Sequence, residues 1–493
     1  MVQSSPSAEP ERVTCHAVIG HPEKTAFLAV QHADGWSVPT LGYAPGPIDY
    51  RAEMINDGMF RKYGLHTRVL RPLLLSGVYH CLEMELAGAG DRRLKAVWVG
   101  PEQYEKFRTN REGEPDPFAR WLEDRRQHRE GPPGTRPPWE SVGWFDTASH
   151  WMEFQLDQLQ MQATGSVEQH RIGSNAAALL RVGTSRGRVF LKAGYGRPPA
   201  EAVLTRALAK RWPDRVPAPL AVDDERNWML TADLDPAGSR PTTAAQLGDC
   251  AEALGALMLE SSVELDAWRG LGCPEHDLFY LDSLAQDPES LDPWLRAGGG
   301  RLDDDERDRL ARVLDAHRAP LAELGRFGLP LALLHADFRA DNLVLTENGP
   351  LVTDWADTVI GHPLFALETA WRAHVDPRTG GLRMPLHRGG TLDEQLAADE
   401  AASGERTAAA PIWEGGEDAL GTLAERLLTP WQSLLPAERL REAFGIARRL
   451  FPLWNFSRLA EDVRWTEPGS PRHLRDVVYL QWAARRLIDG VTA

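Results

Sequence analysis

The sequence contains few cysteines, and none of them stands in a metal-binding or redox pattern. Its 493 residues include four cysteines, Cys15, Cys81, Cys250 and Cys273. No two of them form a CxxC pair, so the spacing supports neither a zinc site nor a disulfide framework. Unpaired cysteines suit a reducing compartment, and we expect a cytoplasmic protein.

Long hydrophobic runs are also missing. The first residues (Met-Val-Gln-Ser-Ser-Pro-Ser-Ala-Glu-Pro) lack the apolar core of a signal peptide, and no apolar stretch approaches the length of a transmembrane helix. Acidic residues outnumber basic ones by 71 to 55, which gives a formal net charge of −16. This charge disfavours nucleic acid and anionic membranes as partners and suits neutral or cationic molecules.

The pattern of apolar residues, glycines and prolines divides the chain into four parts. Residues 1–126 combine short strand-like runs with a helical stretch that ends at Gly64, as expected for a small α/β domain. Residues 127–147 are rich in Pro and Gly and form the best linker candidate. A β-rich lobe at 148–232 and a helical lobe at 233–493 follow, the latter with an insertion at about 376–416. We predict the α+β class.

The most informative stretch covers residues 331–357. An apolar run is followed by His335, Asp337 and Asn342, and a second apolar run is followed by Asp354. Phosphoryl transfer to a hydroxyl needs one carboxylate near the acceptor, and an amide and a second carboxylate that hold the metal on the phosphates. An isolated Asp-x-x-x-x-Asn is more often a loop with Asx turns, but its neighbours favour function. We therefore predict Asp337 as the catalytic base and Asn342 and Asp354 as metal ligands.

Three residues near this set have both a functional and a structural interpretation. His335 is expected to brace the loop through backbone hydrogen bonds. Asp357 either binds a second metal or the substrate, or caps a helix, and the helix cap is the commoner role. Arg339 contacts substrate or is structural.

The β-rich lobe supplies candidates for the nucleotide. Lys192 lies on an otherwise apolar strand, where its charge needs a partner. Phosphates would serve, although a lysine at a sheet edge that reaches solvent is an equally frequent explanation. Glu201, which opens the next helix, is the candidate carboxylate partner, but it also suits a simple interaction with the helix dipole.

Two further segments are candidates for the nucleotide because of their backbones. Gly173, Ser174 and Asn175 lie between two strands, where backbone amides could cover phosphates, although the segment alone is more often a plain turn. It is neither a GxGxxG nor a Walker A sequence. The strand from Trp228 to Ala232 would meet adenine through backbone groups, with Leu230 and Ala232 as the predicted contacts.

Taken together, these residues resemble the aminoglycoside phosphotransferase and choline kinase-like superfamily over about residues 145–493. Its motif, roughly H-G-D-x-x-x-x-N followed by I-D-W/F, stands here as His335-Ala336-Asp337-Phe-Arg-Ala-Asp-Asn342 and Thr353-Asp354-Trp355. The resemblance implies a bilobal protein kinase-like fold, ATP with Mg²⁺ as cofactors, and Lys192 on the phosphates.

The chain departs from this motif at several positions. Ala336 replaces the usual Gly, Ala340-Asp341 replaces Pro-Gly, and Ala366 stands where a later Asp is expected after Gly361-His362-Pro363. These changes concern the substrate and the packing of the loop more than the chemistry, and they point away from a typical antibiotic-resistance enzyme.

The N-terminal part shows a weaker resemblance to a Nudix domain. Trp36-Ser-Val-Pro39 is similar to the strand before the Nudix helix, and Arg61-Lys-Tyr-Gly64-Leu65 to the end of that helix. The Nudix box needs glutamates for metal, whereas the aligned positions hold Asp57, Gly58, Arg61 and Lys62. We therefore expect a degenerate, noncatalytic Nudix-like α/β domain for nucleotide sensing, substrate presentation or dimerisation.

Three functions are consistent with these patterns. The first is an ATP- and Mg²⁺-dependent O-kinase of a small hydroxyl compound: an aminoglycoside, another antibiotic, a sugar or an amino alcohol. The second is a catalytically silent nucleotide-binding regulator, a pseudokinase joined to an inactive Nudix module, against which the intact site residues speak. A protein kinase ranks last, because no separate D-F-G or A-P-E segment is present.

Overall fold

The computed structural model divides the chain into two compact units, residues 1–192 with 385–404 and residues 193–384 with 405–493. The described residues, which are those characterised below, are 13–32, 35–43, 52–76, 79–88, 94–103, 121–123, 137–171, 177–196, 198–234, 239–298, 300–375, 416–466, 468 and 471–490. The predicted phosphate segment 173–175 and insertion residues 376–415 lie outside this set.

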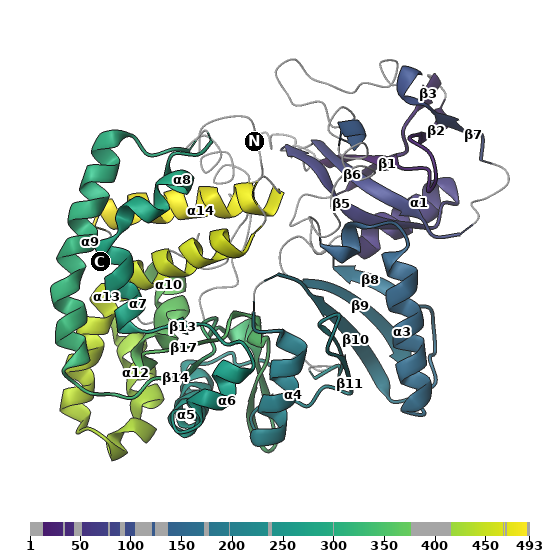
Figure 1. Cartoon of the computed structure of the whole chain (residues 1–493). Helices are drawn as coiled ribbons and strands as arrows, with labels where there is room; N and C mark the ends of the chain where they lie inside the picture. Colours follow the sequence, from purple (N-terminus) through teal and green to yellow (C-terminus); the bar gives the residue numbers. More distant parts are fainter. Residues whose placement is uncertain are drawn as a thin grey trace, which may run out of the picture. The chain divides into compact units, whose positions relative to one another are not determined.

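The first unit begins with two small sheets and one helix (Figure 1). The first sheet has the strand order β4-β1-β6-β5, with β1 and β6 parallel and the other pairs antiparallel. The second sheet has the order β3-β2-β7 and is antiparallel. The elements are β1 (Val13–Ile19), β2 (Phe27–His32), β3 (Gly35–Ser37), β4 (Thr40–Tyr43), α1 (Ala52–Tyr63), β5 (Thr67–Ser76), β6 (Tyr79–Leu86) and β7 (Ala96–Val99).

Alternation along β1 explains how the first sheet and α1 form one core. Cys15 and Ile19 are fully buried in a cluster that also contains Ile55 and Met59 of α1, whereas Val18 is buried in a second cluster with Phe27. Neighbouring side chains of a strand point to opposite faces, so β1 is covered on both sides. The helix ends at Tyr63, and Gly64 adopts the left-handed conformation (φ 67°) that the sequence predicted for a C-terminal cap.

The remainder of the first unit is a helix followed by three neighbouring strands. They are preceded by a short 3-10 helix, and the elements are η3 (Pro138–Glu140), α3 (Trp144–Gln158), β8 (Glu168–Arg171), β9 (Ala177–Thr184) and β10 (Gly187–Gly194). The unit division falls within β10, after Lys192. Residues 137–147, which composition assigned to a linker, hold η3 and the first turn of α3. Pro138 can occupy the first position of a helix, and Trp139 is buried, so this part is anchored by packing.

The turn between β9 and β10 lies where the sequence predicted a hairpin. Ser185 and Arg186 form the two-residue loop, and Gly187 adopts a positive φ of 106°. The hydroxyl of Thr184 accepts a hydrogen bond from the Arg186 amide (3.1 Å) and donates one to the carbonyl oxygen of Gly187 (2.6 Å). The turn is therefore closed by its own residues.

The second unit is mostly helical. Helices α9, α13 and α14 pack against one another, and α5 packs against α12 (Figure 1). The helices are α4 (Glu201–Arg211), α5 (Ala244–Ser261), α6 (Leu265–Gly270), α7 (Leu278–Gln286), α8 (Asp292–Leu295), α9 (Asp304–Gly325), α10 (Glu368–Val375), α12 (Gly416–Leu428), α13 (Ala437–Trp465) and α14 (Pro471–Ile488). The short 3-10 helices are η4 (Pro288–Leu291), η5 (Ala340–Asn342), η6 (Trp355–Asp357), η7 (Pro363–Leu367) and η8 (Pro430–Ser433).

The strands of this unit are short, and those from residue 275 onward lie around the predicted motif. They are β11 (Ala221–Asp223), β12 (Trp228–Ala232), β13 (Glu275–His276), β14 (Ala332–Leu334), β15 (Leu343–Thr346), β16 (Gly349–Val352) and β17 (Val359–Gly361). β17 lies between β13 and β14, and β15 pairs with β16 as an antiparallel hairpin. Both apolar runs of the motif are therefore strands, and the polar residues that follow them lie at strand ends.

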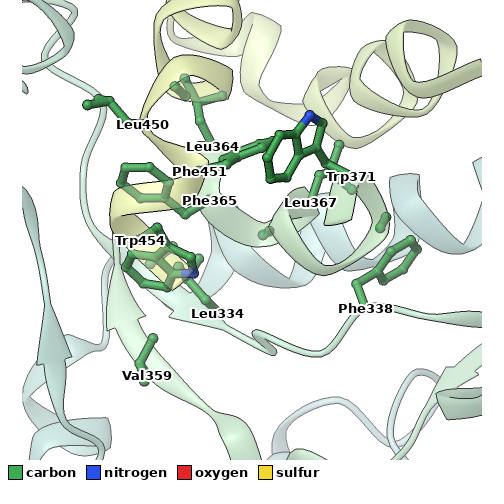
Figure 2. Close-up of a cluster of buried hydrophobic side chains, with 14 of the residues drawn as sticks. Leu334, Phe338, Val359, Leu364, Phe365, Leu367, Trp371, Leu450, Phe451 and Trp454 are labelled. Atoms are coloured by element: carbon green, nitrogen blue, oxygen red, sulfur yellow. The ribbon is translucent and has the colours of Figure 1, made fainter. Parts of the chain in front are cut away.

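A cluster of aromatic and aliphatic side chains lies beneath this region (Figure 2). The rings of Phe365 and Trp454 are stacked at 4.7 Å between centroids, and Trp371 meets Phe451 edge to face at 5.4 Å. Burying such large side chains supplies much of the apolar area that stabilises the unit. This core joins η7 and α10 to α13, and the loop that carries Asp337 packs against it.

The mixture of helices and strands confirms the predicted α+β class. Among the helices of the described residues, none combines the length and the hydropathy that crossing a lipid bilayer requires.

Candidate functional site

The loop that carries Asp337 is anchored by its apolar neighbours. Leu334 ends β14 and is fully buried, and Phe338 is 1% exposed; both lie in the cluster of Figure 2. The hydroxyl of Thr369 on α10 also donates a hydrogen bond to the carbonyl oxygen of Ala336 (3.1 Å). Because residues on both sides of Asp337 are buried, its partly exposed carboxylate is held in a defined place.

His335 joins the two halves of the motif. Its Nδ1 accepts a hydrogen bond from the amide of Asp337 (3.3 Å), so its Nε2 carries the hydrogen that is donated to the carbonyl oxygen of Thr353 (2.7 Å). The ring is fully buried and meets Trp355 edge to face at 4.8 Å. His335 thus connects the loop after β14 to the residue that precedes Asp354.

Asn342 orients the carboxylate of Asp337. Its side-chain amide donates to Asp337 Oδ2 (2.8 Å) and to the Asp337 carbonyl oxygen (3.0 Å). Arg339 Nε lies 3.2 Å from the same Oδ2 without the alignment of a hydrogen bond. Within the described part of the chain, Asp337 Oδ1 has no hydrogen-bond partner, so this oxygen can accept the proton of a bound hydroxyl.

Asp354 lies beside Asn342 because of the register of the β15–β16 hairpin. Leu343 pairs with Val352, and both the amide (2.8 Å) and the hydroxyl (3.0 Å) of Thr353 donate to the carbonyl oxygen of Asn342. Asp354 then adopts a left-handed conformation (φ 64°), which is uncommon for a residue other than Gly. Strained conformations of this kind cluster at functional sites, where the surrounding structure maintains them.

The oxygen atoms of this site suit a hard cation. Asn342 uses its amide nitrogen on Asp337, which leaves its side-chain oxygen for another contact, and Asp354 adds a carboxylate. Mg²⁺ binds to oxygen ligands and is commonly held by one or two carboxylates together with waters and phosphates. Asn342 and Asp354 are therefore the residues that would hold such an ion, whose charge would offset that of the phosphates.

Asp357 has a partner that the sequence did not indicate. Arg458, 101 residues away on α13, lies 3.2 Å from Asp357 Oδ1, and its side chain is only 11% exposed. An arginine in an apolar helical stretch needs a partner for its charge, so the sequence around Arg458 indicates that a partner exists without identifying it. The contact ties α13 to η6, so the structural interpretation of Asp357 is better supported than a second metal site.

The unusual Asp341 is also engaged. Arg240 donates to its carbonyl oxygen (2.6 Å) and to its carboxylate (3.2 Å), and the Asp341 side chain is 70% exposed. Ala336, which replaces the glycine of the family motif, has a φ of 58°, a conformation that glycine adopts without strain. Arg240 thus anchors Asp341, whereas Ala336 holds a backbone conformation that costs an alanine more than the glycine of the family motif.

The third difference from the family motif, Ala366 after Gly361-His362-Pro363, lies in the core. A Cβ on Gly361 would lie 2.9 Å from the carbonyl oxygen of His276, because β13 and β17 pair closely there. Ala366 is 1% exposed, and His362 is 2% exposed with neither ring nitrogen hydrogen-bonded within the described residues. This segment therefore packs as an apolar element.

Because His362 is buried, we expect the stability of the folded protein to depend on pH in the acidic range. Desolvation lowers the pKa of His362 from 6.5 to about 3, so the folded protein keeps this ring neutral while the unfolded chain protonates it below pH 6.5. The free energy of unfolding should therefore fall as the pH drops from 6.5 towards 3, by about 2 kcal/mol at pH 5 from this group alone.

His362→Leu removes this titration. Urea unfolding at pH 7 and pH 5 should show that the variant loses about 2 kcal/mol less than the wild-type protein between the two pH values. Equal acid losses in both proteins would contradict a neutral buried His362.

The nucleotide candidates occupy both units. Lys192 is on β10 in the first unit, where β10 neighbours β9. Glu201 begins α4 in the second unit and is 4% exposed. Leu230 on β12 is buried, and its carbonyl oxygen already accepts a hydrogen bond from the Leu220 amide (2.7 Å), whereas Ala232 is exposed. Of the predicted adenine contacts, Ala232 is therefore the more exposed residue.

Comparison with known proteins agrees with this site. Residues 168–404 match the sequence model of the family described as the phosphotransferase enzyme family, just under half of the chain. This range contains Lys192 as well as the motif residues Asp337, Asn342 and Asp354. No curated protein matches the chain significantly in sequence.

Solved structures show a more distant similarity. A choline kinase from Cryptosporidium parvum has 13% identity, covering 71% of this chain and 93% of its own, with a TM-score of 0.39. A microcompartment-associated aminopropanol kinase has 14% identity, with 69% and 96% covered and a TM-score of 0.40. The aminoglycoside phosphotransferase APH(4)-Ia, in complex with ADP and hygromycin B, has 13% identity, with 69% and 98% covered and a TM-score of 0.37.

These TM-scores are below 0.5, and the assignment rests on the sequence family and on the motif. For residues 168–404, the match supports the phosphotransferase enzyme family.

Proposed function

We propose that this protein transfers a phosphoryl group from ATP, with Mg²⁺, to a hydroxyl group of a small molecule. The observation that carries this proposal is the arrangement around Asp337. Asn342 holds one carboxylate oxygen at 2.8 Å, and the other oxygen has no partner among the described residues. A carboxylate fixed in this way can orient an acceptor hydroxyl and take its proton, which is the role of the base in phosphoryl transfer.

In this proposal, each remaining residue has one role. Asn342 and Asp354 hold the metal, Lys192 contacts the phosphates, and Glu201 is the candidate partner of Lys192. The backbone around Ala232 would meet the adenine. The bilobal protein kinase-like fold belongs to the same proposal, which the family match of residues 168–404 supports.

The charge of the chain bears on the acceptor. The excess of acidic residues, 71 against 55 basic, favours a cationic or neutral hydroxyl compound. ATP consumption by the purified protein with Mg²⁺ should be measured against aminoglycosides, macrolides, sugars and amino alcohols. We expect at least one acceptor to stimulate consumption. Mg²⁺-dependent ATP binding without turnover on a wide panel would instead favour the silent nucleotide-binding regulator.

The metal ligands make a separate prediction. Removing even an outer-shell partner of a metal typically costs about 10–100-fold in affinity, so Asp354→Ala and Asn342→Ala should raise the Mg²⁺ concentration for half-maximal activity at least tenfold. A titration of activity with Mg²⁺ at saturating ATP measures this shift.

A control for this titration is Asn348→Ala. Asn348 is an exposed asparagine in the β15–β16 turn, and its replacement should leave the Mg²⁺ requirement unchanged. Unchanged Mg²⁺ curves for both site variants would remove these residues from metal binding.

We also propose that the N-terminal domain is a noncatalytic Nudix-like domain. The two basic residues at the aligned box positions have structural contacts: Arg61 pairs with Asp57 (3.2 Å), and Lys62 donates to the carbonyl oxygen of Thr40 (2.8 Å). Basic side chains held in this way do not supply the carboxylates that the Nudix box uses for metal. We therefore expect no pyrophosphate hydrolysis by this domain.

A further inference from the structure

The N-terminal sheet ends in a strand whose outer edge is covered by a side chain of the neighbouring lobe. β5 is the last strand of the order β4-β1-β6-β5, so only β6 pairs with it. Edge strands present unpaired amide and carbonyl groups, which need other partners when they are buried. Val69 on β5 is 1% exposed, next to an irregularity in the β5–β6 register.

Gln169 on β8 satisfies both backbone groups of Val69. The Val69 amide donates to Gln169 Oε1 (3.0 Å), and Gln169 Nε2 donates to the Val69 carbonyl oxygen (2.7 Å). The side-chain amide of Gln169 thus makes the same pair of hydrogen bonds to β5 that a backbone peptide group of a further strand would make. Asn56 on α1 donates a further hydrogen bond to Gln169 Oε1 (3.1 Å), and Asn56 is in turn contacted by the hydroxyl of Thr67 (3.3 Å).

A second contact joins α1 to β9. Arg181 lies on β9 directly opposite Glu168 of β8, and its guanidinium contacts both Glu168 (3.0 Å) and Glu53 of α1 (2.7 Å). The Arg181 side chain is 21% exposed, so this pair is partly shielded from water. Gln169 on β8 and Arg181 on β9 therefore attach two neighbouring strands to the N-terminal domain, one each.

A third set of contacts involves the helix that precedes β8. The amide of Gly143 donates to Glu85 on β6 (2.7 Å), and the guanidinium of Arg68 on β5 lies 4.1 Å from the ring centroid of Phe145 on α3. Burial lowers the pKa of Arg68 and raises that of Glu85, as expected for charged groups held in a poorly solvated interface. All of these residues lie in one compact unit.

We infer that the N-terminal domain is a brace for the neighbouring strands β8, β9 and β10, and that Gln169 is a positioning residue for Lys192 on β10. The strand order places β9 between β8, which Gln169 attaches, and β10. Fixing β8 and β9 to a second folded domain restricts the motion of the strand that carries Lys192. The inference rests on the proposed function, because Lys192 is the proposed contact to the phosphates.

Gln169→Leu tests this inference with two independent measurements. Leucine has a similar size but offers no hydrogen bond, so the amide of Val69 should exchange with deuterium at least about tenfold faster, measured by mass spectrometry of a peptide covering residues 67–72. The KM for ATP should rise about tenfold with kcat changed less than twofold, because the residue acts on nucleotide binding and not on proton transfer.

Three other variants complete the design. Gln158→Leu changes an exposed glutamine at the end of α3 and should leave exchange and KM unchanged. Gln169→Glu keeps the acceptor for the Val69 amide but loses the donor, and should give intermediate values. Arg181→Gln loosens the same sheet at another point and should raise the KM for ATP even if Gln169→Leu fails to fold.

The outcomes distinguish a failure of the positioning role of Gln169 from a failure of the proposed kinase function. Faster exchange at Val69 with an unchanged KM in both the Gln169 and Arg181 variants would overturn the positioning role. Should the wild-type protein bind ATP without turnover, the proposed function fails, and the dissociation constant for ATP, measured by calorimetry, replaces KM. An unchanged dissociation constant in the two variants would then overturn the inference.

Discussion

Asp337→Ala is expected to lower kcat by about 10²–10⁴-fold, the range that general-base catalysis contributes. The variant removes the carboxylate oxygen that has no partner among the described residues, and with it the group that would take the proton of the acceptor. Asn342 loses one of its two hydrogen bonds to Asp337 but keeps the other, to the backbone carbonyl oxygen (3.0 Å). The loop should therefore stay in place, and the loss should appear in kcat more than in the KM for ATP.

A matched control lies four residues further along the same loop. Asp341 is also a carboxylate, but its side chain is 70% exposed and contacts Arg240. Asp341→Ala should change kcat by no more than about threefold, since an exposed ion pair contributes little. A purified, folded Asp337→Ala protein that retains wild-type turnover would remove Asp337 from the mechanism. Equal losses in both variants would indicate damage to the loop and not loss of the base.

The second large effect is expected at Gly255 on α5. A Cβ at this position would overlap the carbonyl oxygen of Leu427 on α12 and would lie 3.0 Å from its carbonyl carbon. The obstacle is backbone, so it cannot move aside as the end of a flexible side chain could. Overpacking of this kind costs about 1–3 kcal/mol or more, which exceeds the gain of up to about 1 kcal/mol from replacing glycine by alanine in a helix.

Gly255→Ala should therefore lower the free energy of unfolding by about 2 kcal/mol, measured by urea unfolding followed by circular dichroism. Gly445→Ala is the matched control, because Gly445 lies within α13 and its added Cβ would meet nothing within 4 Å. That variant should be neutral or more stable by up to about 1 kcal/mol. A Gly255→Ala protein as stable as the Gly445→Ala protein would show that the two helices separate at no cost.

Separation of α5 from α12 should also disturb the position of the loop that carries Asp337. Ser261 at the end of α5 accepts a hydrogen bond from the amide of Leu333 on β14 (2.9 Å), and β14 leads into the loop with Asp337. We therefore expect the Gly255→Ala protein to lose activity on warming earlier than the wild-type protein does.

The candidate site was predictable because its residues are close in sequence. Asp337, Asn342 and Asp354 lie within eighteen residues, and one tight hairpin, with Leu343 paired to Val352, brings the second and third together. Short hairpins are set by local pattern and turn chemistry, so spacing alone carries the information. Local pattern likewise predicted a helical stretch that ends at Gly64, where α1 ends at Tyr63.

The contacts that hold the site depend on residues far apart in the chain. Arg458 and Asp357 are 101 residues apart, and Gln169 and Val69 are 100 residues apart. The sequence around Arg458 indicates that its charge needs a partner, but neither spacing nor neighbouring residue types identify that partner or the partner of Gln169. Residues 137–147 of the predicted linker hold η3 and the first turn of α3, and composition does not reveal the burial of Trp139 there.

By itself, the sequence predicted a class of chemistry: a proposed base, two proposed metal ligands and a strand lysine follow from residue type and spacing. Only the tertiary structure decided how these groups are held. It showed that Asn342 orients Asp337, that His335 joins the two strand ends, that Arg458 neutralises Asp357, and that Gln169 completes the edge of another domain's sheet. The physical reason is that hydrogen-bond partners and packing surfaces are chosen when the whole chain folds, whereas a spacing motif is a property of one short segment.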